Sequence, residues 1–542
     1  MIRKISLTLT AYCLTIICFA QENSGEVHGD FDLNMQSYQE DELIGAEAAD
    51  EIILNNAYLN INYTKGLFSA GLRYESYLNA LLDYDDEYKG NGIPFRYATY
   101  TIDGLEITAG NYYEQIGSGL IFRSYENKGL GMDNAMDGVR LKYRPTKGVY
   151  LKTFIGKNRT YFTYADGVIR GVDTEINLNE SLNLDAKTKI ILGQGFVSRF
   201  QSDNNPKFNL PQNVAAYSSR LNIIHGKWNY SGEYAIKLND PIGSLTAKEN
   251  NYANGNALMS NIAYSQRGFG IIAEMHRVDH MEFRSERAQE KQYVINYIPT
   301  LTKQHTYTLL ALYPCATQPE GEFGMQFDIF YKFQKGSLLG GKYGSKLALN
   351  YSRINGLNGG NSFLNDNTEH NAMLISITGE ELYFQDINIE VYKKINKKVK
   401  VTGILAKQSY NKDVLEGKTT YGTVESTIAI ADISYKIKKG HTIRVELQEL
   451  LANGGEGSWS MGLVEYTISP HWFFAVQDMY NWGNHDAEKQ LHYLNINCGF
   501  LKGSNRFTIG YGKKRAGIFC VGGVCKEVPS SNGFSLTISS SF

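Results

Sequence analysis

A short polar motif, His276-Arg-Val-Asp279-His280, contains the residue types of this chain that come closest to a catalytic or metal-binding site. An imidazole beside a carboxylate can activate water or bind a metal ion. The ten histidines are otherwise scattered, and the motif falls where a predicted strand ends, a place that is usually polar. We therefore predict no catalytic residue and no metal site, and we keep a hydrolase that uses Asp279 and His280 as the alternative.

A glycine-rich stretch, Gly336-Ser-Leu-Leu-Gly-Gly341-Lys342, has the spacing of a phosphate-binding loop. Tyr343 follows where such a loop needs a serine or threonine for Mg²⁺, and no strand–loop–helix pattern surrounds the stretch. The stretch therefore predicts a turn between two strands. Dinucleotide-binding, nucleophile-elbow and zinc-protease motifs do not occur, so we predict no cofactor.

The pair Cys520-Val-Gly-Gly-Val-Cys525 lies in the last long link, just before the last strand-like segment. In an exported chain, two cysteines around a Gly-Gly turn can close a small disulfide ring. A metal site is the alternative, but it needs two further ligands, and Cys315 and Cys498 are far away in the sequence. We predict a disulfide.

The first twenty residues have the pattern of a signal peptide. Arg3 and Lys4 precede an apolar stretch that ends at Ala20 and is too short for a spanning helix. The rest of the chain has no apolar run long enough to cross a membrane as a helix. Because helices and closed barrels are the only structures that satisfy every backbone group in lipid, we predict a signal peptide at 1–20 and one outer-membrane β-barrel at 21–542.

Side chains alternate between apolar and polar along most of the mature chain. Val27, Phe31 and Leu33 share one face of a predicted strand, and His28 and Asp30 share the other. Aromatic residues make up 12% of the chain, with 38 Tyr, as expected for the aromatic girdles of a barrel. The same period of two recurs in many segments of about ten residues, among them 57–63, 68–74, 139–143, 323–331, 387–391, 399–405 and 443–448.

Short and long links take turns between these segments, as tight periplasmic turns and longer extracellular loops do. The segments predict an antiparallel barrel of 24 strands, or of 26 if 293–298 and 305–312 form a further pair around Pro299. Either number is even and places both chain ends in the periplasm. The space inside such a barrel, its lumen, is too wide for side chains alone to fill.

The last ten residues have the pattern of a closing barrel strand. Phe534, Leu536, Ile538 and Phe542 share one face, and Phe542 is the final residue. This resembles the C-terminal insertion signal of outer-membrane barrels, except that Ser540 is polar where an apolar residue is usual. We expect the barrel-assembly machinery to read this strand during insertion.

The long link at 117–135, with the strand end before it, mixes charges, glycines and apolar residues. Its charges include Glu114, Arg123, Glu126 and Asp133. If the link folds inward, these charges can pair with strand residues such as Arg140 and constrict the lumen. An ordered extracellular loop is the alternative.

Three stretches together, 115–126, 305–322 and 520–525 with the Lys-Glu-Val-Pro that follows, resemble a family of uncharacterised outer-membrane barrels of Bacteroidota. The resemblance implies a location and a fold over nearly the whole mature chain. It implies no activity, which must be argued from the site.

The sequence favours a transport or channel component, or an integral subunit of an outer-membrane complex. A hydrolase at the membrane rim and a structural or partner-binding barrel are the alternatives. The net charge of −2, without long runs of one sign, argues against a nucleic-acid partner. The expected partners are outer-membrane lipid, the assembly machinery and other subunits of a complex.

Overall fold

Long antiparallel strands make up most of the chain. The computed structural model describes residues 25–203, 210–240, 254–287, 293–357, 381–418, 420–521 and 524–542. The predicted signal peptide at 1–20 lies outside the described residues. Among the helices that the structure describes, none is long and apolar enough to cross a membrane.

Twenty-four strands form one sheet, the wall of the barrel. They are β1 (Glu26–Gln36), β2 (Leu54–Lys65), β3 (Phe68–Asn79), β4 (Gly90–Ile102), β5 (Leu105–Tyr112), β10 (Met136–Thr146), β11 (Val149–Thr160), β12 (Thr163–Asn177), β13 (Thr188–Phe200), β14 (Asn213–His225), β15 (Trp228–Lys237), β16 (Gly255–Gln266), β17 (Phe269–Asp279), β18 (Gly321–Phe333), β19 (Ser345–Asn355), β20 (Leu382–Lys394), β21 (Val399–Asn411), β22 (Thr423–Lys438), β23 (His441–Asn453), β24 (Trp459–Ile468), β25 (Trp472–Tyr480), β26 (Asn495–Lys502), β27 (Asn505–Lys514) and β30 (Ser531–Ser541).

Short elements occur in the links between wall strands. They are η2 (Asp86–Tyr88), β6 (Gln115–Ile116), β7 (Phe122–Arg123), β8 (Glu126–Asn127), β9 (Met132–Asp133), α2 (Leu178–Ser181), α3 (Lys412–Leu415), η4 (Ala487–Lys489), β28 (Gly517–Val521) and β29 (Val524–Val528).

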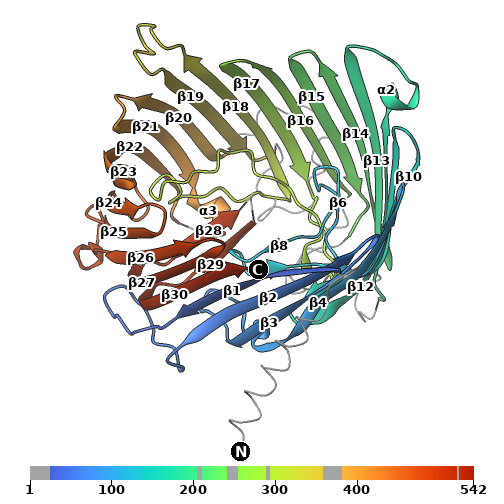
Figure 1. Cartoon of the computed structure of the whole chain (residues 1–542), viewed down its shortest axis with the longest axis horizontal. Helices are drawn as coiled ribbons and strands as arrows, with labels where there is room; N and C mark the ends of the chain where they lie inside the picture. Colours follow the sequence, from blue (N-terminus) through green and yellow to red (C-terminus); the bar gives the residue numbers. More distant parts are fainter. Residues whose placement is uncertain are drawn as a thin grey trace, which may run out of the picture.

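The wall closes on itself, and Figure 1 shows it as a ring of strands. Each strand pairs antiparallel with its neighbours in the chain, and β1 pairs with β30 from Asp30 opposite Ser541 to Gln36 opposite Ser535. The predicted fold class, a closed antiparallel barrel, is confirmed with 24 strands.

Alternation along each strand separates the two faces of the wall, as β3 illustrates. Leu72 and Tyr74 are 36% and 39% exposed on the outer face, whereas Arg73 and Glu75 are buried on the inner face. An apolar outer band and a polar lumen are what lipid on one side and water or protein on the other require.

Most short links lie at one end of the barrel, and most long links lie at the other. Two residues connect β2 to β3 and β4 to β5 at the end where β1 begins and β30 ends. Two links at this end are longer than the tight turns that the sequence predicts there. They are residues 178–187, which contain α2, and residues 334–344. At the other end β11 and β12 are joined by only two residues, because their pairing extends to Thr160 and Thr163.

The Gly336–Lys342 stretch forms a turn between β18 and β19, as predicted. The amide of Gly336 donates to the carbonyl of Gly341 at 2.7 Å, and Gly341 donates to Ser337 at 2.8 Å. Both glycines have positive φ angles, +85° and +56°. A left-handed backbone of this kind favours glycine, so the turn geometry accounts for the glycines.

The alternative of 26 strands is wrong, because 293–298 and 305–312 do not pair with each other as wall strands. The described chain between β17 and β18 instead crosses the inside of the ring (Figure 1). Leu309, Leu310 and Leu312 are buried there against inner side chains such as Ile428 and Trp459. Their alternation reflects burial in the lumen, which the period of two does not distinguish from a lipid-facing strand.

The seam between the first and last strands ends at Phe542. Its amide donates to the carbonyl of Gly29 at 3.0 Å, and the amide of Gly29 donates to the carbonyl of Phe542 at 2.9 Å. A side chain at position 29 would meet the Phe542 ring at 2.9 Å, so the ring lies against the glycine. The terminal residue therefore extends the pairing that closes the sheet.

We expect deletion of Phe542 to lower the stability of the barrel more than Phe542→Ala does. The deletion removes two backbone hydrogen bonds, each worth about 1 kcal/mol, whereas the substitution keeps them and loses only the ring. Urea unfolding of the refolded barrel measures the difference, with Phe519→Ala outside the wall as the control. Equal losses for the deletion and the substitution would show that the ring alone matters.

Candidate functional site

Two insertions enter the lumen and together form what we call the plug. The first plug segment is 113–135, between β5 and β10, and the second is 280–320, between β17 and β18, described at 280–287 and 293–320. Each begins and ends on paired residues, because Tyr112 lies opposite Met136 and Asp279 lies opposite Gly321. The wall is therefore continuous behind the plug.

The two plug segments bind each other through backbone and amide groups. The amide of Arg123 donates to the carbonyl of Ile295 at 2.7 Å, and the amide of Tyr297 donates to Gly119 at 2.9 Å. The side chain of Asn134 donates to the carbonyl of Val294 at 2.8 Å. The Arg123 guanidinium also lies 4.0 Å from the centre of the Tyr297 ring. Cation–π contact and hydrogen bonds thus join the segments into one body.

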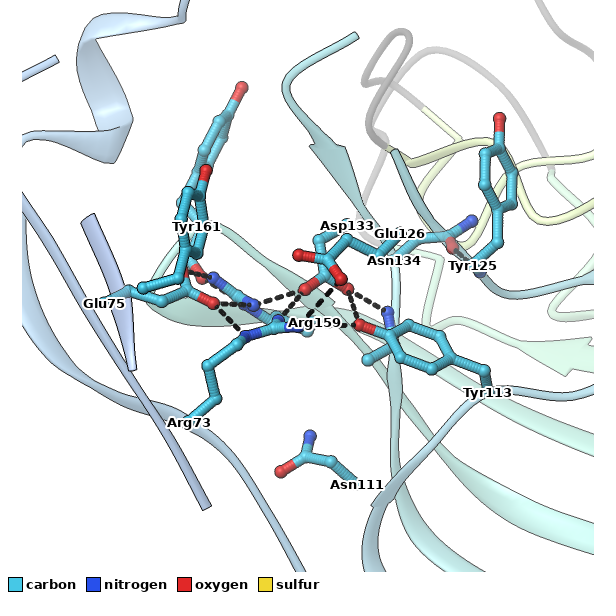
Figure 2. A network of polar contacts seen from close by, with 12 residues as sticks. Arg73, Glu75, Asn111, Tyr113, Tyr125, Glu126, Asp133, Asn134, Arg159 and Tyr161 are labelled. Atoms are coloured by element: carbon cyan, nitrogen blue, oxygen red, sulfur yellow. Dashed lines mark hydrogen bonds and ion pairs between the residues drawn. The ribbon is translucent and has the colours of Figure 1, made fainter. Parts of the chain in front are cut away.

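Buried charges fix the first plug segment to the wall (Figure 2). Arg73 of β3 binds Glu75 at 2.6 Å and contacts Asp133 of the plug. Arg159 of β11 binds Glu75 and Asp133, each at 2.5 Å, and its side chain is 1% exposed. Glu126 of the plug completes the cluster at 3.1 Å from Arg73. One plug carboxylate, Asp133, thereby bridges two arginines from distant strands.

This cluster of two arginines and three carboxylates is stable only as a unit. Taking isolated charges out of water costs several kcal/mol each, and pairing in good geometry repays that cost. The Tyr113 hydroxyl donates to Asp133 at 3.1 Å. Burial raises the pKa of Tyr113 well above its usual range, so the phenol is a neutral donor. Burial also raises the pKa of Glu126, against the opposing effect of Arg73.

A second set of charged wall side chains contacts the start of the first plug segment. Glu114 lies 2.9 Å from Lys152 and 3.5 Å from Arg140. The amide of Ser118 donates to Glu233 of β15 at 2.7 Å. Gly117 has a φ of +56°, and a Cβ there would lie 2.6 Å from the side chains of both Arg220 and Glu233. Only glycine therefore fits where the plug touches this pair.

The start of the second plug segment packs with the first segment against β12 to β17. Its later part, from Lys303, lies along β20 to β23 with polar side chains on acidic partners. Lys303 binds Glu390 at 3.1 Å, His305 binds Asp386 at 2.7 Å, and the Tyr307 hydroxyl donates to Asp432 at 3.1 Å. Buried leucines follow, and they pack in an apolar cluster with residues of β19 to β25. This part of the plug therefore combines ion pairs with a dry core.

The predicted lumen-facing charges all lie in or against the plug. Glu114, Glu126 and Asp133 pair with wall cations, and Arg140 pairs with Glu106 at 2.7 Å and with Glu114. Arg123 contacts the rings of Tyr125 and Tyr297 rather than a wall charge. Sequence reasoning missed the partners on the wall, which are Arg73, Glu75, Lys152, Arg159, Arg220 and Glu233.

The polar motif at the end of β17 does not converge on one site. His276 binds Glu322 at 2.7 Å with both side chains fully buried, whereas His280 binds Asp279 at 2.6 Å and lies 3.8 Å from Glu320. Burial lowers the pKa of His280, but the hydrogen bond to Asp279 and the charge of Glu320 outweigh it and raise the pKa. Among the described residues no three His, Cys, Asp or Glu side chains are grouped to hold a metal ion.

A disulfide joins Cys520 and Cys525 across the hairpin of β28 and β29, as predicted. Lys526 of this hairpin binds Asp83 at 2.7 Å, and a Cβ at Gly129 of the plug would lie 3.3 Å from the Phe519 ring. The hairpin therefore contacts the first plug segment at Gly129 and the link between β3 and β4 at Asp83.

A family model matches residues 1–542, the whole chain. The chain belongs to the family of unknown function DUF6029. The predicted resemblance to uncharacterised barrels is confirmed at the level of a family of unknown function, and the Bacteroidota origin stays a prediction. No curated protein matches the chain.

Solved structures of outer-membrane barrels are similar to this family member. A chain of the E. coli P pilus tip assembly intermediate PapC-PapD-PapK-PapG matches with a TM-score of 0.49 and 10% identity, over 97% of this chain and 62% of that one. The siderophore receptor PirA from Pseudomonas aeruginosa matches at 0.41 and 9%, over 96% and 82%. The outer membrane protein opdK from the same organism matches at 0.35 and 12%, over 79% and 99%. At such identities the likeness concerns the fold.

We expect Asp133→Ala to loosen the first plug segment by about 3–5 kcal/mol, because it leaves two buried arginines short of a counter-charge. Amide hydrogen exchange of residues 115–133 measures the change. Asp137→Ala is the matched control: its partner Arg96 is 52% exposed at 3.0 Å, and such pairs contribute about 1 kcal/mol or less. Equal loosening in both variants would contradict an anchoring role for the buried cluster.

Proposed function

We propose that this chain is an outer-membrane transport component whose lumen is closed by its own plug and opens when the plug moves. In this proposal residues 1–20 direct export, the assembly machinery inserts the barrel through the strand that ends at Phe542, and lipid surrounds the apolar outer face. The observation that carries the proposal is that two insertions enter the lumen and attach to wall charges. A barrel of 24 strands would otherwise enclose a wide aqueous channel.

The attachment of the first plug segment supports a movable rather than a permanent closure. Its contacts with the wall include many ion pairs and hydrogen bonds, such as Asp133 with Arg159 and Glu114 with Lys152. Water can replace these polar partners when the segment leaves. Ile116, Leu120 and Phe122 of the same segment are buried in an apolar cluster with wall residues, and exposing them opposes opening. Because the wall strands pair behind each insertion, the plug can move without breaking the barrel.

One observation favours a second candidate, a permanently closed subunit of an outer-membrane complex. Leu309, Leu310 and Leu312 of the second plug segment are buried in a cluster that includes Trp459 and Ile428. Pulling three leucines from a dry core into water costs roughly 1.5–3 kcal/mol for each. If both plug segments have to move together, this cluster opposes opening.

Conductance in planar bilayers separates the two candidates. We expect the wild-type barrel to be silent and a variant with both plug segments replaced by short glycine-rich turns to carry a large steady current. Tyr112 and Met136, and likewise Asp279 and Gly321, are already paired, so each replacement leaves the strands in register.

The control for this experiment removes the β28–β29 hairpin between Lys514 and Ser531, which are also paired. This variant keeps the plug and should stay silent. Circular dichroism and protease resistance establish that each variant is folded. A folded double replacement without current would exclude the transport proposal and leave the closed subunit.

A further inference from the structure

A cavity of about 300 Å³ lies against the first plug segment, inside the wall of β12 to β17. Gly117 and Ser118 of the first plug segment and Leu301 of the second contribute to its lining. The wall contributes mainly polar and charged side chains, which are Glu175, Arg220, Asn222, Ser231, Glu233, Ser260, Asn261 and Glu274. Cavities of this size with a few convergent polar groups are typical of sites for small molecules.

Two charged groups in this lining each have one buried atom without a hydrogen-bond partner among the described residues. Glu233 is 6% exposed, and its Oε2 accepts from the amide of Ser118, but its buried Oε1 has no hydrogen-bond partner among the described residues. Arg220 binds Asp173 through Nη2 at 2.5 Å, but its buried Nη1 has none among them. Buried polar groups are nearly always satisfied, so an acceptor and a donor left over at one cavity point to a ligand.

The two groups are directly opposite each other on β14 and β15, yet they do not form the expected ion pair, because Gly117 of the plug lies between them. The free donor and the free acceptor therefore remain on either side of the plug tip. Both atoms are covered, so a ligand in the cavity reaches them only when the plug tip moves. Glu175 and Glu274 add further carboxylates to the lining, and Asn261 contacts Glu274. Nη1 of Arg220 can donate to an acceptor on a ligand. The carboxylates of the lining outnumber its positive charges and can bind a cationic group.

We propose that this cavity binds a small zwitterion, a solute that carries an ammonium group and a carboxylate. The carboxylate would accept from Nη1 of Arg220, and the ammonium would donate to Oε1 of Glu233. This deepens the proposed function by naming the substrate class. A neutral polyol would leave the excess carboxylates without a counter-charge, and an anion would be repelled by them.

The position of the site couples binding to the plug. Ser118 shares the Glu233 carboxylate that the ligand would use, and Gly117 fits only because no side chain is there. A ligand that draws Glu233 and Arg220 toward itself weakens their contacts with the plug tip. Binding and loosening of the first plug segment are then linked, because a ligand favours the state to which it binds better.

Calorimetric titration of the full, detergent-solubilised barrel tests the proposal without any measurement of current. Four small probes separate the ligand classes: glutamine as the zwitterion, putrescine as a cation, acetate as an anion and glycerol as a neutral polyol. We expect glutamine to bind and the other three to bind at least about tenfold more weakly, since each lacks at least one charge-assisted hydrogen bond. Equal or tighter binding of any of these three probes overturns the proposal.

Two conservative variants and one control locate the site. Glu233→Gln keeps an oxygen that can accept from Ser118, and Arg220→Lys keeps a positive charge for Asp173, so the plug remains docked in both. We expect each to weaken glutamine binding about tenfold. Glu465→Gln on the inner face of β24, outside the cavity lining, should leave binding unchanged.

Amide hydrogen exchange of the first plug segment accompanies each titration and shows whether the plug is intact. An equal loss of binding in Glu465→Gln and Glu233→Gln, with the plug intact, would overturn the assignment. A closed, silent barrel that still binds glutamine would contradict transport but not the site. If the wild-type barrel does not bind glutamine but the variant with both plug segments replaced conducts, transport is supported and the site is rejected.

Discussion

Closure of the sheet between β1 and β30 is the constraint on which the rest of this structure depends. Lipid offers no hydrogen bonds, so an unpaired strand edge would leave a row of unsatisfied backbone groups. The chain removes that edge by pairing Phe542 with Gly29 at the very end of the last strand. Twenty-four strands closed in this way enclose more space than side chains fill, and the plug occupies part of that space.

The strands that satisfy lipid outside must carry polar side chains inside, and this determines how a plug can bind. Arg73 and Glu75 alternate with Leu72 and Tyr74 on one strand, so the lumen presents charges wherever the outer face presents apolar groups. A purely apolar plug would bury these charges without partners. The first plug segment pairs with these wall charges through Asp133 and Glu126. The second contacts wall carboxylates through Lys303, His305 and Tyr307.

Much of this could be predicted from local sequence patterns, because the period of two and the terminal aromatic residue are local properties. The charge content of 113–135 also indicated a segment that needs partners. The partners themselves could not be predicted, since Arg159 and Glu75 meet Asp133 only once the barrel closes and the link folds inward. Alternation at 305–312 was misleading, because burial against Trp459 and contact with lipid select the same apolar residues. The wall charges could have been found from the alternation itself, because Arg73 and Glu75 occupy the positions of their strand that face the lumen.

The plug is not uniformly attached, and the difference between its two halves bears on how the lumen opens. The first segment combines a buried apolar cluster around Phe122 with ion pairs and with a glycine fitted between Arg220 and Glu233, where the wall keeps unsatisfied polar atoms. The second adds a leucine cluster that water cannot replace. A charged solute can compete for the polar contacts of the first segment but not for the apolar contacts of either segment. Because Arg123, Asn134 and Tyr297 join the segments, loosening these polar contacts also weakens the support of the second segment, which makes them the place where a ligand can act.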